Sequence, residues 1–121
     1  MENLLKLLNK ELKKVTAESF YAVNRKKQVV YPYLTYDFDT TRLESSVDGI
    51  YIDIDIFDNK SSYLDIVRLE ERLKEHLHNQ VKLIDGSHVR FYWRGSNKVP
   101  TLDENIKRRQ STYQLRVINI S

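Results

Sequence analysis

Two aspartates in the middle of the chain are its best candidates for paired carboxylates. Asp53 and Asp55 alternate with isoleucines in segment 50–57, so in a strand both project from one face. Two carboxylates placed in this way can hold a cation or share acid–base work. A metal site needs further ligands, and the neighbouring position on that face is Tyr51. Cross-strand ion pairs explain the two aspartates more simply, with one of three arginines as partner: Arg90, Arg94 or Arg116.

The other residue types that carry chemistry form no known catalytic or metal-binding pattern. His76 and His78 are two residues apart, which places them on different faces of a helix, and His88 stands alone. The chain has no cysteine, which excludes disulfides, thiolate nucleophiles and cysteine-based zinc sites. Its 3 glycines stand singly, so they form no phosphate-binding loop. We therefore expect a protein that is not an enzyme and that needs no metal or cofactor.

Charge is spread unevenly along the chain. The net charge is only +3, but residues 1–30 carry +4, residues 31–60 carry −5 and residues 91–121 carry +4. These charges either neutralise one another within one domain or form an acidic and a basic face. The second arrangement favours head-to-tail contact between identical subunits. Its candidate subunit contacts are three acidic and three basic residues: Asp53, Asp55, Asp58, Arg25, Lys26 and Lys27.

A small nucleic-acid-binding module is the alternative interpretation of the basic segments. The cations at 25–27 and 107–109 could contact phosphates, and Tyr92 and Trp93 could stack on bases. Segment 89–93 lacks the glycine and phenylalanine pattern of an RNA-recognition motif. The basic triplets therefore favour a solvated or protein-contacting role over specific nucleic-acid binding.

Two amphipathic helices are predicted to pack on a sheet. Segment 3–15 has leucines at helical spacing with lysines on the opposite side. A second apolar period starts after Ser62, which with Asp65 matches a loose capping box. Between and after the helices, strands are predicted at 19–23, 29–38, 50–57, 81–84, 87–93 and 112–120. The isoleucines of segment 50–57 should face the second helix.

Turn residues divide these strands. Asp85 and Gly86 tolerate the positive φ angles of a type I′ turn, which predicts a hairpin. Pro32 cannot donate a ladder hydrogen bond, so it indicates a strand start or an edge position. A polar connection is expected over 39–46. The element order is α-β-β-β-α-β-β-β, which predicts an α+β fold with an antiparallel sheet packed against two helices.

The segment from Gly95 to Ser111 is predicted to be a long polar loop or projecting arm, because it has no apolar period to bury. Its charged residues are candidates for contact with a partner: Asp103, Glu104, Lys107, Arg108 and Arg109. We expect replacement of the basic triplet by alanine to leave a folded monomer that no longer assembles.

The length of 121 residues predicts a single domain, 1–121. The longest apolar runs are far below the roughly 20 residues needed to cross a bilayer. The first residues also lack the basic-then-apolar order of a signal peptide. We expect a soluble protein that stays inside the cell that makes it.

In their order along the chain, several segments resemble the tail-completion or tail-terminator proteins of long-tailed bacteriophages. The resemblance is closest to the tail-to-head joining proteins of siphophages that infect Gram-positive bacteria. It covers nearly the whole chain, from the leading helix through segments 30–34, 43–44, 52–58, 69–70, 89–92, 103–109 and 113–116. Phe57 stands where a tryptophan is expected, a change that should preserve packing.

The resemblance implies a structural protein of the virion, made in the cytoplasm of the host bacterium. Such proteins form a ring, usually of six subunits, at the head-proximal end of the tail tube. The ring stops tube growth and joins the tail to the head, so its implied partners are other copies of itself, the major tail tube protein and the head-completion or stopper protein of the connector. DNA passes through the ring without sequence-specific binding, and no membrane is involved. The resemblance further implies subunits that are monomeric before assembly, with segments that become ordered at the interface.

Overall fold

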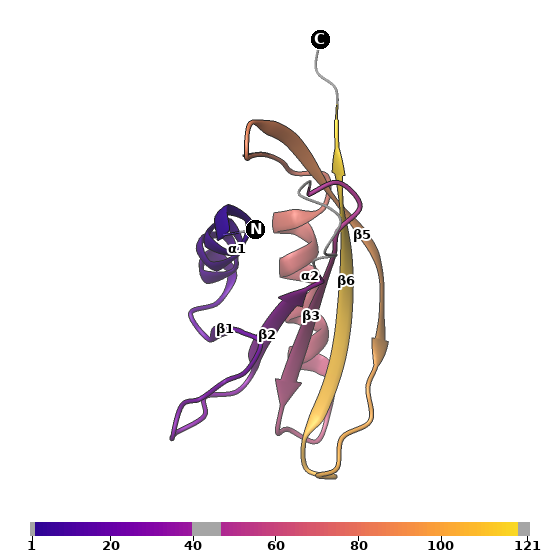
Figure 1. The fold of residues 1–121 in the computed structure, drawn as a ribbon. Helices are drawn as coiled ribbons and strands as arrows, with labels where there is room; N and C mark the ends of the chain where they lie inside the picture. Colours follow the sequence, from indigo (N-terminus) through magenta and orange to yellow (C-terminus); the bar gives the residue numbers. More distant parts are fainter. Residues whose placement is uncertain (1, 40–46, 119–121) are drawn as a thin grey trace.

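Residues 2–39 and 47–118, which the computed structural model describes, form two helices and six strands (Figure 1). The predicted α+β class and element order are confirmed. The elements are α1 (Glu2–Val15), β1 (Ser19–Tyr21), β2 (Tyr33–Phe38), β3 (Tyr51–Asp58), α2 (Leu64–Leu77), β4 (Val81–Ile84), β5 (Ser87–Lys98) and β6 (Lys107–Val117). The expected connection over 40–46, with the 43–44 segment of the resemblance, and the expected strand end at 119–120 lie outside the described residues.

The six strands form one sheet in the order β1-β2-β3-β6-β5-β4. The expectation of an antiparallel sheet is wrong at one edge, where β1 runs parallel to β2. The loop over residues 22–32 carries the chain back to the start of β2, which sets this direction. Pro32 lies immediately before β2, so no ladder hydrogen bond is lost there.

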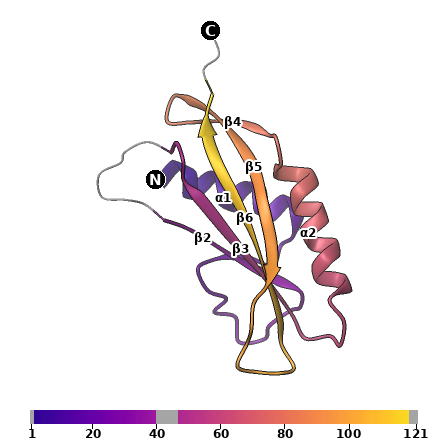
Figure 2. The ribbon, with the colours of Figure 1, turned by 90° about the vertical axis from the view of Figure 1, so that its right-hand side faces the viewer.

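Both helices lie on the same face of the sheet (Figures 1 and 2). The isoleucines Ile52, Ile54 and Ile56 of β3 point to that face and are buried, as predicted. Four apolar residues of α1, which their helical spacing places on one side of the helix, are buried in the same core: Leu4, Leu8, Leu12 and Val15. No described helix covers the opposite, outer face, which carries Asp53 and Asp55 of β3 and Gln110 and Thr112 of β6.

A buried carboxylate fixes α1 against its neighbours. Glu11 is only 2% exposed, and its Oε1 lies 2.7 Å from Nζ of Lys82 on β4. Its Oε2 lies 2.8 Å from Nζ of Lys14 and 3.8 Å from Nε2 of His76 on α2. Burial raises the pKa of Glu11, but the hydrogen bonds and charges of Lys14 and Lys82 outweigh burial and lower it to about 2.

The predicted hairpin at residues 85–86 is confirmed. Asp85 has φ 50° and Gly86 has φ 81°, the two positive angles that a type I′ turn requires. The predicted capping box of α2 is wrong. The N-cap is Tyr63, and Ser62 instead accepts a hydrogen bond from the backbone N–H of Leu64 at 3.1 Å. The second helix therefore begins one residue later than the pattern suggests.

The predicted polar arm over 95–111 is largely a β-hairpin. Strand β5 continues to Lys98 and β6 begins at Lys107, so only residues 99–106 form the connection. The paired residues include Asn97 with Gln110 and Lys98 with Arg109. A register shift between Trp93 and Gly95 leaves Arg94 without a partner in the ladder, and pairing continues to Lys98. The end of the hairpin lies at the bottom of Figure 2, beyond the main body of the sheet.

Candidate interaction surfaces

The two predicted carboxylates lie on the outer face of the sheet and contact β6. Oδ1 of Asp55 lies 3.0 Å from Nε of Arg108 and 3.3 Å from Nε2 of Gln110. Asp53 accepts a hydrogen bond of 2.9 Å from the hydroxyl of Thr112. The expected arginine partners are wrong, because β6 lies between β3 and β5 in a register that brings residues 107–114 beside β3.

Asp58, the third acidic candidate for a subunit contact, is buried at the end of β3. Its Oδ1 lies 3.1 Å from Nζ of Lys60, which also lies 3.2 Å from Asp65. The hydrogen bonds that Lys60 donates to Asp58 and Asp65 raise the pKa of the lysine. Asp58 thus stabilises the turn before α2, and its carboxylate is withdrawn from the surface of the subunit.

The three basic candidates Arg25, Lys26 and Lys27 are exposed in the loop after β1. Nζ of Lys26 lies 2.8 Å from Oε1 of Glu18, and it lies 5.6 Å from the ring centre of Phe20. Arg25 and Lys27 make no ion pair within the described residues. This loop therefore presents at least two uncompensated cations to solvent.

The basic triplet 107–109 lies in strand β6, where two of its members are held by the chain's own carboxylates. Arg108 pairs with Asp55 on the outer face. Arg109 points to the helical side, with its Nε 2.7 Å from Oε1 of Glu70 on α2. Lys107 stands over the ring of Tyr63, 5.6 Å from its centre. These contacts support the fold, so the triplet is not the free arm that the sequence suggests.

The hairpin tip, defined as residues 99–106, contains the two acidic arm candidates. Asp103 accepts a hydrogen bond of 2.9 Å from the backbone N–H of Asn105. The hydroxyl of Thr101 lies 2.6 Å from the carbonyl of Asp103 and 2.7 Å from that of Ile106. Glu104 makes no ion pair within the described residues. The tip is thus an ordered loop that presents carboxylates to solvent.

Leu102 is the functional candidate that the sequence analysis missed. Its side chain is fully exposed at the hairpin tip. The available signal was its position as an apolar residue next to an acidic pair within a polar segment. Single exposed apolar side chains are common on protein surfaces, so the candidate is Leu102 together with the acidic pair Asp103 and Glu104 that follows it.

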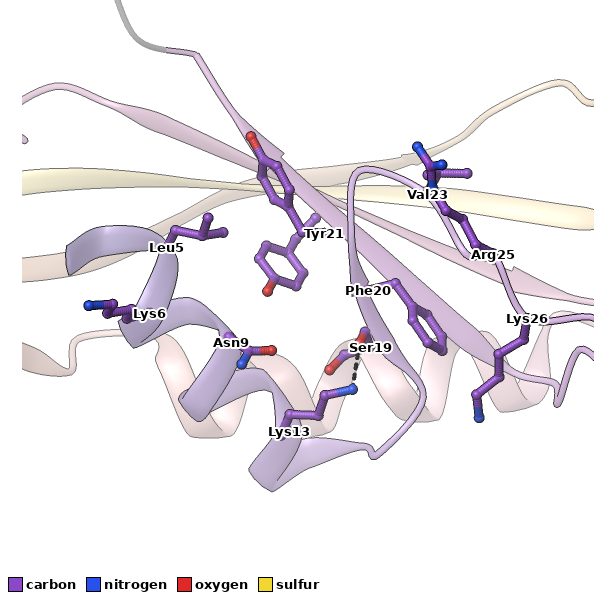
Figure 3. A pocket seen from close by; sticks show the side chains of 11 residues that line it. Leu5, Lys6, Asn9, Lys13, Ser19, Phe20, Tyr21, Val23, Arg25 and Lys26 are labelled. Carbon is purple, nitrogen blue, oxygen red and sulfur yellow. Dashed lines mark hydrogen bonds between the residues drawn. The ribbon is translucent and has the colours of Figure 1, made fainter. Parts of the chain in front are cut away.

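A groove of about 650 Å³ lies between α1, β1 and the loop after β1 (Figure 3). We call it the α1–β1 groove. Its apolar part comes from Leu5, Phe20, Tyr21, Val23 and Tyr36, and its basic side chains are Lys6, Lys13, Arg25 and Lys26. None of the described residues that line it is acidic. Burial raises the pKa of Tyr21, and the charge of Asp37 raises it further, so this phenol stays neutral.

The histidines do not come together. His78 accepts a hydrogen bond of 3.0 Å from the backbone N–H of Trp93, and His76 lies near Glu11. Within residues 2–39 and 47–118, no group of three histidine, aspartate or glutamate side chains could hold a metal ion. In the same part of the chain, neither helix combines the length and apolar character that crossing a membrane requires.

Comparison with solved structures finds chains of similar fold. The fold is similar to that of a protein chain from the virion of a native gene transfer agent particle, with a TM-score of 0.67. The match covers 88% of this chain and 83% of that chain, at 9% sequence identity. No protein-family model matches the sequence, and no curated protein matches it. The chain therefore shares nearly its whole fold with a component of a virion.

Proposed function

We propose that this chain is a structural protein of a phage-like virion. The observation that carries the proposal is the shared fold with a chain of a gene transfer agent virion, which spans most of both chains. The described residues also form a groove with an exposed apolar lining and basic side chains around it. Such a surface suits a protein that works by binding its neighbours.

We propose further that the chain is a tail-completion protein that forms a ring at the head-proximal end of the tail tube. The support is the order of segments that resembles the tail-to-head joining proteins of siphophages. In this role, copies of the chain contact one another, the tail tube protein and the stopper protein of the head connector. DNA passes through the ring without sequence-specific contacts.

Deletion of the gene from the genome that encodes the particle tests both levels of the proposal. Mass spectrometry of purified wild-type particles should find the chain. Particles from the deletion strain should have tails of abnormal length that are not attached to heads, as seen by electron microscopy, and the wild-type gene should restore them. Absence of the chain from particles contradicts the virion role. Its presence together with normal attached tails in the deletion strain contradicts the tail-completion role.

The nucleic-acid-binding alternative stays a prediction, and a gel-shift series with duplex and single-stranded DNA tests it. Binding that weakens steeply as salt is added would favour it. Arg108 and Arg109 are paired with carboxylates of the same chain, which counts against phosphate contacts there, whereas Arg25 and Lys27 make no ion pair within the described residues.

A further inference from the structure

The hairpin tip and the α1–β1 groove differ in the charge of their side chains, the tip being acidic and the groove basic. The tip presents one fully exposed apolar side chain, Leu102, followed directly by Asp103 and Glu104. Residues 99–106 contain no lysine or arginine. The groove offers aromatic and aliphatic side chains with basic groups around them and no acidic group among its described lining, and two of these basic groups, Lys6 and Lys26, pair with Glu2 and Glu18 beside it. The acidic tip with its exposed leucine thus matches the apolar and basic character of the groove.

Within one subunit the two surfaces belong to different parts of the fold. The groove lies beside β1 at one edge of the sheet, whereas the tip joins β5 and β6, and β2, β3 and β6 lie between β1 and β5 in the sheet. The tip cannot reach its own groove while β5 and β6 stay paired. A contact between the two surfaces therefore requires a second molecule.

We propose that the hairpin tip of one copy of this chain docks in the α1–β1 groove of a second copy. This inference deepens the proposed function and rests on it, because a structural virion protein is present in many copies in one particle. Leu102 enters the apolar part of the groove, between Tyr21 and Val23. The carboxylates of Asp103 and Glu104 face Arg25, which makes no ion pair within the described residues, and Lys6, which pairs with Glu2 at 3.1 Å in the single subunit. Because tip and groove are different surfaces, the contact is head-to-tail and repeats from copy to copy.

The two surfaces are already formed in the single subunit, which lowers the entropy lost on docking. The hydrogen bonds of Thr101 and Asp103 hold the tip loop in one shape. On the groove side, Nζ of Lys13 donates to the carbonyls of Ala17 and Ser19 at 2.9 and 2.7 Å, which ties α1 to β1. Tyr21 is 45% exposed and Val23 is 48% exposed, so docking of Leu102 removes apolar surface from water on both sides.

Disulfide cross-linking between two single-cysteine variants tests the contact directly, since the natural chain has no cysteine. Full-length Leu102→Cys protein is mixed with full-length Val23→Cys protein at the highest soluble concentration under mild oxidation. The matched control replaces the second variant by Leu83→Cys, which is 64% exposed on the opposite edge strand. We expect the 102–23 disulfide in clear excess over the 102–83 disulfide. Equal yields, or no 102–23 product, would overturn the proposal.

Charge reversal gives an independent test by sedimentation. The variants Arg25→Glu and Glu104→Lys should each self-associate less than the wild type, and an equimolar mixture of the two should associate again. In a contact between the two variants, positions 104 and 25 carry opposite charges or keep their natural pair, whereas contacts within one variant bring like charges together, so recovery in the mixture is specific to this pair. Lys27→Glu, in the same loop but outside the groove, is the control for Arg25→Glu. Failure of the mixture to recover would contradict the assignment.

The hydrophobic part of the contact is tested with Leu102→Ser, which should weaken self-association by about tenfold or more. An unchanged association constant would count against docking of Leu102.

The inference and the proposed function can be refuted independently of each other. Cross-linking of the purified chain with absence from particles refutes the function alone. Presence in particles in which the Leu102→Cys thiol links to another virion protein, and never to the Val23→Cys thiol, refutes the inference alone.

Discussion

Replacement of Glu11 by glutamine should remove a large share of the free energy of unfolding at neutral pH. The ordinary pKa of a glutamate is 4.5, and in the folded chain the pKa of Glu11 is about 2. At about 1.4 kcal/mol for each pKa unit, this difference corresponds to about 3 kcal/mol. Lys14 is half exposed and Lys82 is 30% exposed, so water screens part of the attraction. We therefore expect a loss of about 2–3 kcal/mol.

The pH dependence has a definite sign, because the folded pKa lies below the unfolded value. The contribution of Glu11 is complete above about pH 5 and is lost as the pH falls toward 2. The difference between wild type and Glu11→Gln should therefore narrow over this range. Urea unfolding followed by circular dichroism at several pH values measures it.

Glu2→Gln serves as the matched control, since Glu2 pairs with Lys6 at 3.1 Å on the exposed side of the same helix. This variant should unfold at nearly the same urea concentration as the wild type at every pH. Two results would refute the reasoning. One is a Glu11→Gln protein as stable as the wild type at pH 7, and the other is a stability difference that does not shrink on acidification.

Three further variants test other parts of the structure. Glu70→Ala should cost about 3 kcal/mol in urea unfolding, because it leaves the partly buried Arg109 without its carboxylate; Glu75→Ala on the exposed side of α2 is the comparison. Gly86→Ala should lower stability by about 1 kcal/mol, because φ of 81° strains any residue with a Cβ, whereas Ser87→Ala should change little. Leu102→Ser should leave the melting temperature unchanged, since this side chain is fully exposed in the subunit, and a clear decrease would show a role in folding.

Strong local patterns predicted their elements correctly. The alternation of isoleucines in segment 50–57 correctly predicted both the strand and its buried face, because apolar residues at every second position over eight residues are typical of a half-buried β-strand. Asp85 and Gly86 defined their turn through the φ angles they tolerate. The leucine spacing of α1 likewise placed the helix to within a residue.

The last residues of β5 and the first residues of β6 were not predicted as strand, because the residues of β6 that face the helices there are polar. Arg109 and Ser111 occupy positions that face the helices, so the apolar alternation of a strand is missing there. Arg109 is tolerated because Glu70 on α2 neutralises it, a contact between segments 39 residues apart. The partner of Asp55 escaped prediction for a related reason, since the sequence contains no signal for which strand lies beside β3.

Because both helices lie on one face of the sheet (Figure 1), the outward and inward residues of each strand are subject to different evolutionary constraints. Substitutions at Gln110, Thr112 or Gln114 alter only the face that no described helix covers, while the residues between them in β6 hold the core. Neighbouring positions of a single strand can therefore diverge at different rates. Substitutions at the outward positions, which are every second residue of the strand, can therefore adapt the outer surface to a changed partner while the buried residues stay the same.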